Sequence, residues 1–150
     1  MEVDAAQYSV ISMEMSWTKS FLHVYEHGND YLDKPPLLFW STAISYLVFG
    51  ISNLTYKLPS VLITLLGIYS TYRFARMHYK KEVAIAAALI LASSQALFLI
   101  TNDVRTDSML LGLTLFSVWQ MSAYLKDRKA LNFVLLSIGI AGAMLSLIHI

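Results

Sequence analysis

The chain has 150 residues, of which 57% are hydrophobic and only 14% are charged, and its mean hydropathy is +0.56. A soluble domain of this length would need more charge on its surface, so the composition predicts an integral membrane protein. The net charge of +1 argues against nucleic-acid binding, and the absence of cysteine excludes disulfides and thiolate metal sites.

Residues 1–35 are a long mixed-polar stretch, which we interpret as an external loop that contains an amphipathic helix. Tyr8, Ile11 and Met15 fall on one face of that helix, and polar residues occupy the rest, as expected for a helix on a bilayer surface. Asp4 could cap the helix at its N-terminus, which is the structural alternative to a catalytic role.

Asp33 and Lys34 stand directly before a diproline, where the sequence becomes apolar. Pro36 suits the first turn of a helix, and the proline ring keeps the residue before it extended. We therefore expect Lys34 at the boundary between membrane and water, where its ammonium group could bind the phosphate of a lipid-linked substrate. The following apolar stretch, residues 36–50, gives about 22 Å of helix against a bilayer core of about 30 Å. Residues 36–56 are therefore predicted as a short juxtamembrane or re-entrant helix.

Residues 57–144 are predicted as a transmembrane helical bundle. The apolar segments 58–74, 83–100, 109–124 and 131–148 are each close to the length of a span. The fold class is therefore all-α, a polytopic membrane protein with about four transmembrane helices and amphipathic juxtamembrane helices.

Basic residues fix the expected orientation, because positive charge concentrates in cytoplasmic loops. They gather in the two loops that follow the first and third spans: Arg73, Arg76, Lys80 and Lys81, then Lys126, Arg128 and Lys129. The intervening segment around residues 102–107 is then external, and so is Lys57. If residues 36–50 crossed the bilayer, Lys34 would be cytoplasmic. If they lie along the surface or re-enter, which we favour, then Asp4, Lys34, Lys57, Asp103 and Asp107 share the outer face.

Asp103 and Asp107 are four residues apart, so on one helix they would lie on the same face, with Arg105 turned away. Two carboxylates at a membrane surface, with Asp4 nearby, could supply a general base, a metal ligand or both. The alternative is that they merely mark the water-exposed end of a span.

Several short motifs occur in an order that is typical of one family. They are Val3-Asp4-Ala5-Ala6-Gln7-Tyr8, Tyr31-Leu32-Asp33-Lys34-Pro35-Pro36-Leu37, Phe49-Gly50, Lys57-Leu58-Pro59 and Arg105-Thr106-Asp107. With these, residues 1–144 resemble the N-terminal part of the membrane-embedded glycosyltransferases of the GT-C type. Within that group the chain is similar to the 4-amino-4-deoxy-L-arabinose lipid A transferase and protein O-mannosyltransferase families, glycosyltransferase families 39 and 83.

The resemblance implies sugar transfer from a polyprenyl-phosphate-linked donor to a lipid or protein acceptor on the external face of the plasma membrane. It implies that Asp4 and Asp107 are catalytic and that Lys34 contacts the lipid phosphate. Tyr8, Lys57 and Arg105 are implied as further substrate-binding residues. Asp33 stands where relatives often carry Glu, at a possible ligand of a divalent metal ion.

Two departures from the family pattern change the expected phosphate contacts. Gln7 occupies a position where many relatives carry arginine, so one phosphate contact would be missing. Lys57 replaces a usual arginine, which keeps the charge but loses the bidentate fork.

The chain is expected to be an N-terminal fragment, inactive alone, because relatives have a membrane helix before Asp4 and several hundred residues after position 150. Residues 145–150 resemble translated adapter sequence and are predicted to be a non-native tail.

A transporter segment is the alternative function from a different class, and a non-catalytic membrane scaffold is a third. A transporter would place Asp and Lys within its spans and interrupt paired half-segments with Gly or Pro. Here the charges lie at segment ends, which favours the transferase.

Overall fold

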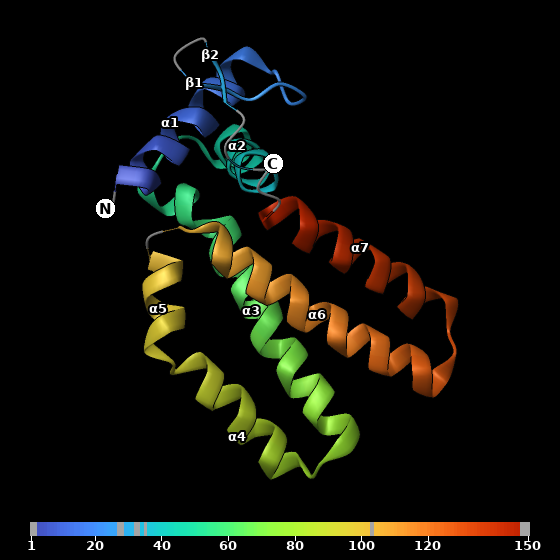
Figure 1. The fold of residues 1–150 in the computed structure, drawn as a ribbon. Coiled ribbons are helices and arrows are strands. Elements are labelled where there is room, and N and C mark those ends of the chain that lie inside the picture. Colours follow the sequence, from blue (N-terminus) through green and yellow to red (C-terminus); the bar gives the residue numbers. More distant parts are fainter. Residues whose placement is uncertain (1–2, 27–28, 32–33, 35, 103, 148–150) are drawn as a thin grey trace.

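The computed structural model describes residues 3–26, 29–31, 34, 36–102 and 104–147 (Figure 1). Helices dominate this part of the chain, and the predicted all-α class is confirmed. The elements are α1 (Val3–Thr18), β1 (Tyr25–Glu26), β2 (Asn29–Asp30), α2 (Leu37–Phe49), α3 (Asn53–His78), α4 (Lys81–Ala92), α5 (Gln95–Asn102), α6 (Thr106–Asp127) and α7 (Ala130–Leu147).

The elements form two layers. Helices α1 and α2, with the antiparallel pair β1–β2, form a cap at one end of the bundle of α3 to α7 (Figure 1). In the bundle α3 and α6 run away from the cap, and α4–α5 and α7 return toward it. Both basic loops, α3–α4 and α6–α7, therefore lie at the end opposite the cap.

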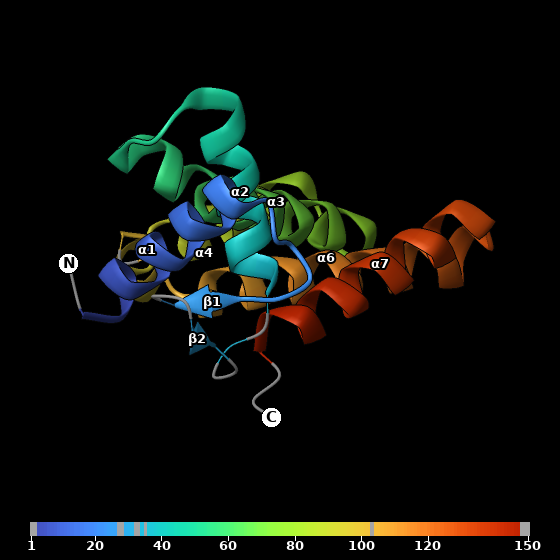
Figure 2. The same cartoon turned by 90° about the horizontal axis from the view of Figure 1, so that it is seen from above.

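Helix α2 crosses the direction of the bundle helices. It is seen nearly end-on in Figure 1 and lengthwise in Figure 2, whereas α6 and α7 extend across both views. This is the orientation that a helix lying along a membrane surface would need. That α2 occupies such a surface stays a prediction.

The core of the cap confirms the predicted apolar face of α1. Tyr8, Ile11 and Met15 are buried against the side of α2 that carries Phe39. Ser12, which the helical pattern placed on the polar side, is also buried, and its hydroxyl donates to the Tyr8 carbonyl at 2.8 Å. A hydroxyl that satisfies itself on its own helix can be buried at little cost, which the hydropathy pattern does not reveal.

Three local predictions are wrong. Helix α1 begins at Val3, so Asp4 lies within its first turn and does not precede the helix as an N-cap. The predicted span 83–100 is broken between α4 and α5 at Ser93 and Ser94, where the Ser94 hydroxyl accepts from the Leu97 amide at 3.3 Å. Asp103 lies outside the described residues, but no single helix joins positions 103 and 107, because the non-helical residues Val104 and Arg105 precede the start of α6 at Thr106.

Helices α3 and α6 cross at two glycines. A Cβ placed on Gly67 would lie 2.8 Å from the Gly112 Cα, and one placed on Gly112 would collide with the Ile63 carbonyl. The absence of side chains thus permits the two backbones to pack directly against each other.

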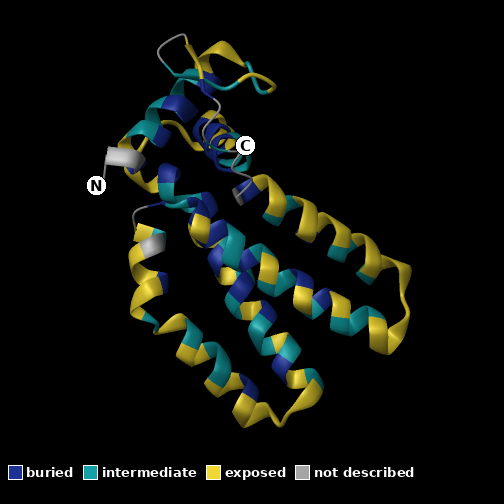
Figure 3. Cartoon of the chain, viewed as in Figure 1, coloured by how far each residue is buried: buried dark blue, intermediate teal, exposed yellow. Residues whose placement is uncertain are grey.

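Figure 3 shows exposed residues along the outer faces of α4 and α7, and many of these residues are large and apolar. Of the described helices, α6 alone combines the length and the apolar composition needed to cross a bilayer, and α2 and α7 are apolar but shorter. The count of about four spans stays a prediction.

Candidate functional site

The starts of α1, α3 and α6, which carry predicted site residues, and the end of α5 are joined by hydrogen bonds under the cap. The Tyr56 hydroxyl, in the first turn of α3, donates to the Ala5 carbonyl of α1 at 2.6 Å. Lys57 Nζ donates to Asn102 Oδ1 at the end of α5, also at 2.6 Å. Ser60 and Ser108 share a hydrogen bond of 2.5 Å between α3 and the first turn of α6. The start of α1, which contains Asp4, is therefore connected to the helix ends that carry Lys57 and Asp107.

Lys34 precedes α2, which begins at Leu37. Its side chain is half-buried, and Pro36 occupies the N-cap position of the helix without making a side-chain cap hydrogen bond. The first backbone N–H groups of a helix point outward and carry partial positive charge, so this end can bind an anion together with Lys34. Asp33 lies outside the described residues.

Asp107 is exposed in the first turn of α6, where its charge also stabilises the positive end of the helix. Arg105 precedes that helix and is half-buried. Between α5 and α6, Val104 has a φ of +53°, which is rare for a β-branched residue, and its side chain is fully buried in the core of the cap. Burial of this apolar side chain offsets the backbone strain and fixes the turn that orients both residues.

Tyr8 belongs to the core of the cap. Its ring is 6% exposed and meets Phe39 edge-on, with ring centroids 5.7 Å apart. Its substrate-binding role therefore stays a prediction. Tyr46 of α2 shares a 2.9 Å hydrogen bond with Ser9, and burial raises the pKa of the Tyr46 phenol above its usual value, against the opposing effect of that bond. Together these contacts fix α1 on α2.

Gln7, at the position where many relatives carry arginine, has a defined partner. Its side-chain nitrogen donates to both carboxylate oxygens of Glu26, at 2.8 and 2.9 Å, and so links α1 to β1. The amide thus bonds to a carboxylate, as an arginine at this position could, but it adds no positive charge near a phosphate.

Within the described part of the chain, no group of three or more His, Cys, Asp or Glu residues could hold a metal ion. Asp33 and Asp103 fall outside that part, and the Asp4 side chain is not described. The metal predicted at Asp33 stays a prediction, and we derive no chemical step through it.

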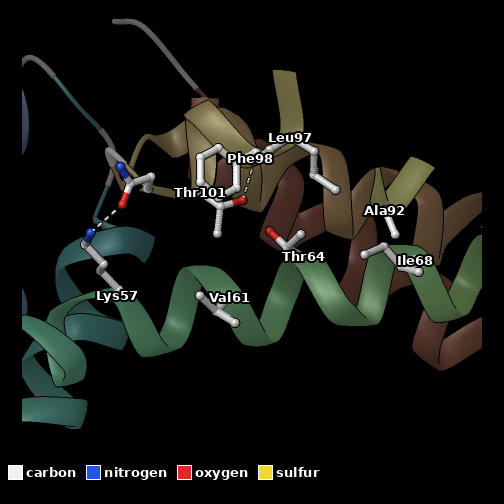
Figure 4. Close-up of a pocket in the computed structure, with 9 residues that line it drawn as sticks. Lys57, Val61, Thr64, Ile68, Ala92, Leu97, Phe98 and Thr101 are labelled. Carbon is white, nitrogen blue, oxygen red and sulfur yellow. Dashed lines mark hydrogen bonds between the residues drawn. The ribbon is translucent and has the colours of Figure 1, made fainter. Parts of the chain in front are cut away.

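A groove lies beside the Lys57–Asn102 pair, between α3 and α4–α5 (Figure 4). Its volume is about 290 Å³, and its walls are mainly apolar. Sequence reasoning missed Tyr56, Asn102 and this groove, because all three depend on contacts between distant segments of the chain. The separation is 51 residues for Tyr56 and Ala5 and 45 for Lys57 and Asn102. Asn102 stands next to Asp103 in the sequence, which was the only available signal.

Comparison with known proteins places the chain in a family. Residues 33–149 match the family described as dolichyl-phosphate-mannose-protein mannosyltransferase. The chain belongs to this mannosyltransferase family. The predicted resemblance to the GT-C glycosyltransferases is thereby confirmed.

A curated relative of this mannosyltransferase-family chain is the undecaprenyl phosphate-alpha-4-amino-4-deoxy-L-arabinose arabinosyl transferase 2 of Proteus mirabilis, strain HI4320. The two are 32% identical over 108 residues, which cover 71% of this chain and 20% of the Proteus protein.

The fold is also that of two crystal structures of ArnT from Cupriavidus metallidurans. The structure bound to undecaprenyl phosphate superposes with a TM-score of 0.89 at 22% identity, over 97% of this chain and 28% of ArnT. The apo structure gives a TM-score of 0.85 over 95% of this chain. The chain thus spans between a fifth and a third of the length of these relatives.

Proposed function

We propose that this chain is part of a membrane glycosyltransferase that moves a sugar from a polyprenyl-phosphate donor to a lipid or protein acceptor. The observation that carries the proposal is the set of hydrogen bonds that joins the start of α1, which contains Asp4, to the starts of α3 and α6, which carry Lys57 and Asp107. In the proposed orientation the bundle α3 to α7 crosses the plasma membrane and the cap faces the exterior. The basic loops at the far end support that orientation.

Two observations support a polyprenyl-phosphate donor. The Proteus relative is named for an undecaprenyl-phosphate-linked sugar, and one ArnT structure holds undecaprenyl phosphate. In this chain Lys34 and the start of α2, which has no side-chain cap hydrogen bond, are neighbours in sequence, and each favours a bound phosphate.

The proposed reaction is a displacement at the anomeric carbon. The acceptor oxygen attacks that carbon while the bond between it and the polyprenyl phosphate oxygen breaks, and the bonding electrons leave with the phosphate. The Asp4 carboxylate takes the proton of the acceptor hydroxyl or phosphate. Because there is a single displacement, the configuration at the anomeric carbon inverts. Lys34 stabilises the negative charge that develops on the departing phosphate, and Asp107 positions the acceptor.

The test replaces Asp4 by Asn in the full-length protein, isolated in membranes and assayed with a polyprenyl-phosphate-linked sugar. Removing a general base typically costs a factor of about 100 to 10,000 in rate, so sugar transfer should fall by that amount. Asp127→Asn is the matched control, because Asp127 is the last residue of α6 at the opposite end of the bundle. Substantial transfer by Asp4→Asn, at the level of the control, would exclude Asp4 as the base.

A further inference from the structure

The groove between α3 and α5 has a polar mouth and an apolar interior. Lys57 and Asn102 lie at the mouth, and Val61, Ile68 and Phe98 belong to the apolar walls (Figure 4). The partner of Lys57 within the described part of the chain is the neutral Asn102 amide, so the pair retains a positive charge. An elongated molecule with an anionic head and a hydrocarbon chain complements this arrangement.

Thr64, halfway along the groove, has a hydroxyl that needs a hydrogen-bond partner from the bound molecule. Its side chain is 8% exposed, and its hydroxyl has no hydrogen-bond partner among the described residues. Figure 4 shows that hydroxyl directed into the space between α3 and α5. Two other hydroxyls of the same helix behave differently, because Ser70 donates to the Leu66 carbonyl at 2.6 Å and Thr71 to the Gly67 carbonyl at 3.0 Å. A buried hydroxyl without a partner is costly, and among the described residues the groove supplies no hydrogen-bond acceptor for Thr64.

We propose that this groove binds an anionic, ester-linked phospholipid of the surrounding bilayer. Its phosphate lies at Lys57, an ester carbonyl accepts a hydrogen bond from Thr64, and one acyl chain follows the apolar walls. Lys57 and Thr64 are seven residues apart on α3, which places them on one face of the helix with a rise of about 10 Å between them. A lipid whose phosphate meets the flexible Lys57 side chain can therefore pass Thr64 with its glycerol ester region. The resemblance implied Lys57 as a substrate-binding residue, and we assign it to the bilayer lipid instead. The donor phosphate is proposed at Lys34, and the test of the groove does not depend on sugar transfer.

The chemistry favours a bilayer phospholipid over a polyprenyl phosphate. Below its phosphate a polyprenyl chain consists only of hydrocarbon, so it could occupy the walls but would leave the Thr64 hydroxyl unpaired. An ester-linked lipid supplies the missing carbonyl together with the negative charge.

The test compares lipids that differ only in that carbonyl. Full-length protein is purified in detergent and titrated in native mass spectrometry with ester-linked dioleoyl phosphatidylglycerol and with its ether-linked analogue. One hydrogen bond changes affinity about fivefold, so wild-type protein should bind the ester lipid about five times more tightly. Thr64→Val, which replaces the hydroxyl by a methyl group of similar size, should bind both lipids equally.

Thr71→Val is the matched control, because it removes a hydroxyl from the same helix that is already bonded to its own backbone. It should keep the fivefold preference, and all variants should elute from size-exclusion chromatography as the wild type does. Equal binding of ester and ether lipid by wild type, or an unchanged preference in Thr64→Val, would overturn the proposal. Polyprenyl phosphate should bind to wild type and Thr64→Val alike. If Thr64→Val lost affinity for polyprenyl phosphate alone, the groove would be assigned to the donor instead.

Discussion

The backbone conformation at position 50 explains why this residue is glycine. Gly50 ends α2 with a φ of +81° and a ψ of +168°, a backbone conformation that is essentially restricted to glycine. A Cβ added there would meet no atom of the described residues within 4 Å, so space is not the constraint. The Phe49-Gly50 pair in the family pattern thus reflects the turn between α2 and α3.

We expect Gly50→Ala to destabilise the protein by about 1–3 kcal/mol through backbone strain alone. Thermal unfolding of purified protein in detergent would measure the loss. Ile51→Ala is the control, since Ile51 is half exposed at the next position. If the two variants unfolded at the same temperature, the turn would have to tolerate another backbone conformation.

Helices α2 and α3 are joined by a hydrogen bond that depends on a proline. Pro59 lies inside α3 and has no N–H to donate to the carbonyl of Thr55, four residues earlier. The hydroxyl of Ser45, on α2, donates to that carbonyl at 2.8 Å, and all three residues are buried. The proline therefore frees an acceptor on α3 that fixes the position of α2.

Ser45→Ala should cost about 1–3 kcal/mol, because it leaves the buried Thr55 carbonyl without its partner. In a Pro59→Ala background the helix can supply its own N–H, so the same substitution should cost much less. Thermal unfolding of the four proteins in this double-mutant cycle measures the coupling. Additive effects would show that Ser45 and Pro59 act independently.

The elements that sequence predicted well are those whose pattern is local. The apolar segments 58–74, 109–124 and 131–148 fall within a few residues of α3, α6 and α7, since long apolar runs determine these helices. The break at Ser93 and Ser94 was missed because it interrupts an apolar run that is otherwise continuous. The expectation of one helix through positions 103 and 107 failed because Val104 takes a left-handed conformation that its residue type does not suggest.

The candidate site also contains residues that local motifs predict and contacts that only the packing of helices reveals. The order of the motifs made candidates of Lys34, Lys57, Asp107 and the helix that contains Asp4, because each stands in a short recognisable string. The bond between Lys57 and Asn102 and the unpaired hydroxyl of Thr64 required the packing of α3 against α5. Local sequence carries no record of such contacts.

At the scale of the whole molecule, the orientation of α2 decides whether one site can exist. If α2 lies across the bundle in the membrane surface, Lys34 before it and Lys57 after it stay on the same side of the bilayer. If α2 crosses the bilayer, the two lysines are on opposite sides. Asn29 and Asn53, which are exposed on either side of α2 in the chain, report on this difference.

Residues 1–150 contain no cysteine, so single cysteines can be introduced into a cysteine-free full-length protein without background from this region. We expect Asn29→Cys and Asn53→Cys to react with a membrane-impermeant maleimide in intact cells. Lys81→Cys, in the basic loop at the far end, should react only after the cells are permeabilised. Labelling of Asn29→Cys without Asn53→Cys would mean that α2 spans the bilayer, and Lys34 could then not act in one site with Asp107. Labelling of Lys81→Cys alone would mean that the orientation is opposite to the proposed one, and that the proposed sugar transfer takes place on the cytoplasmic face.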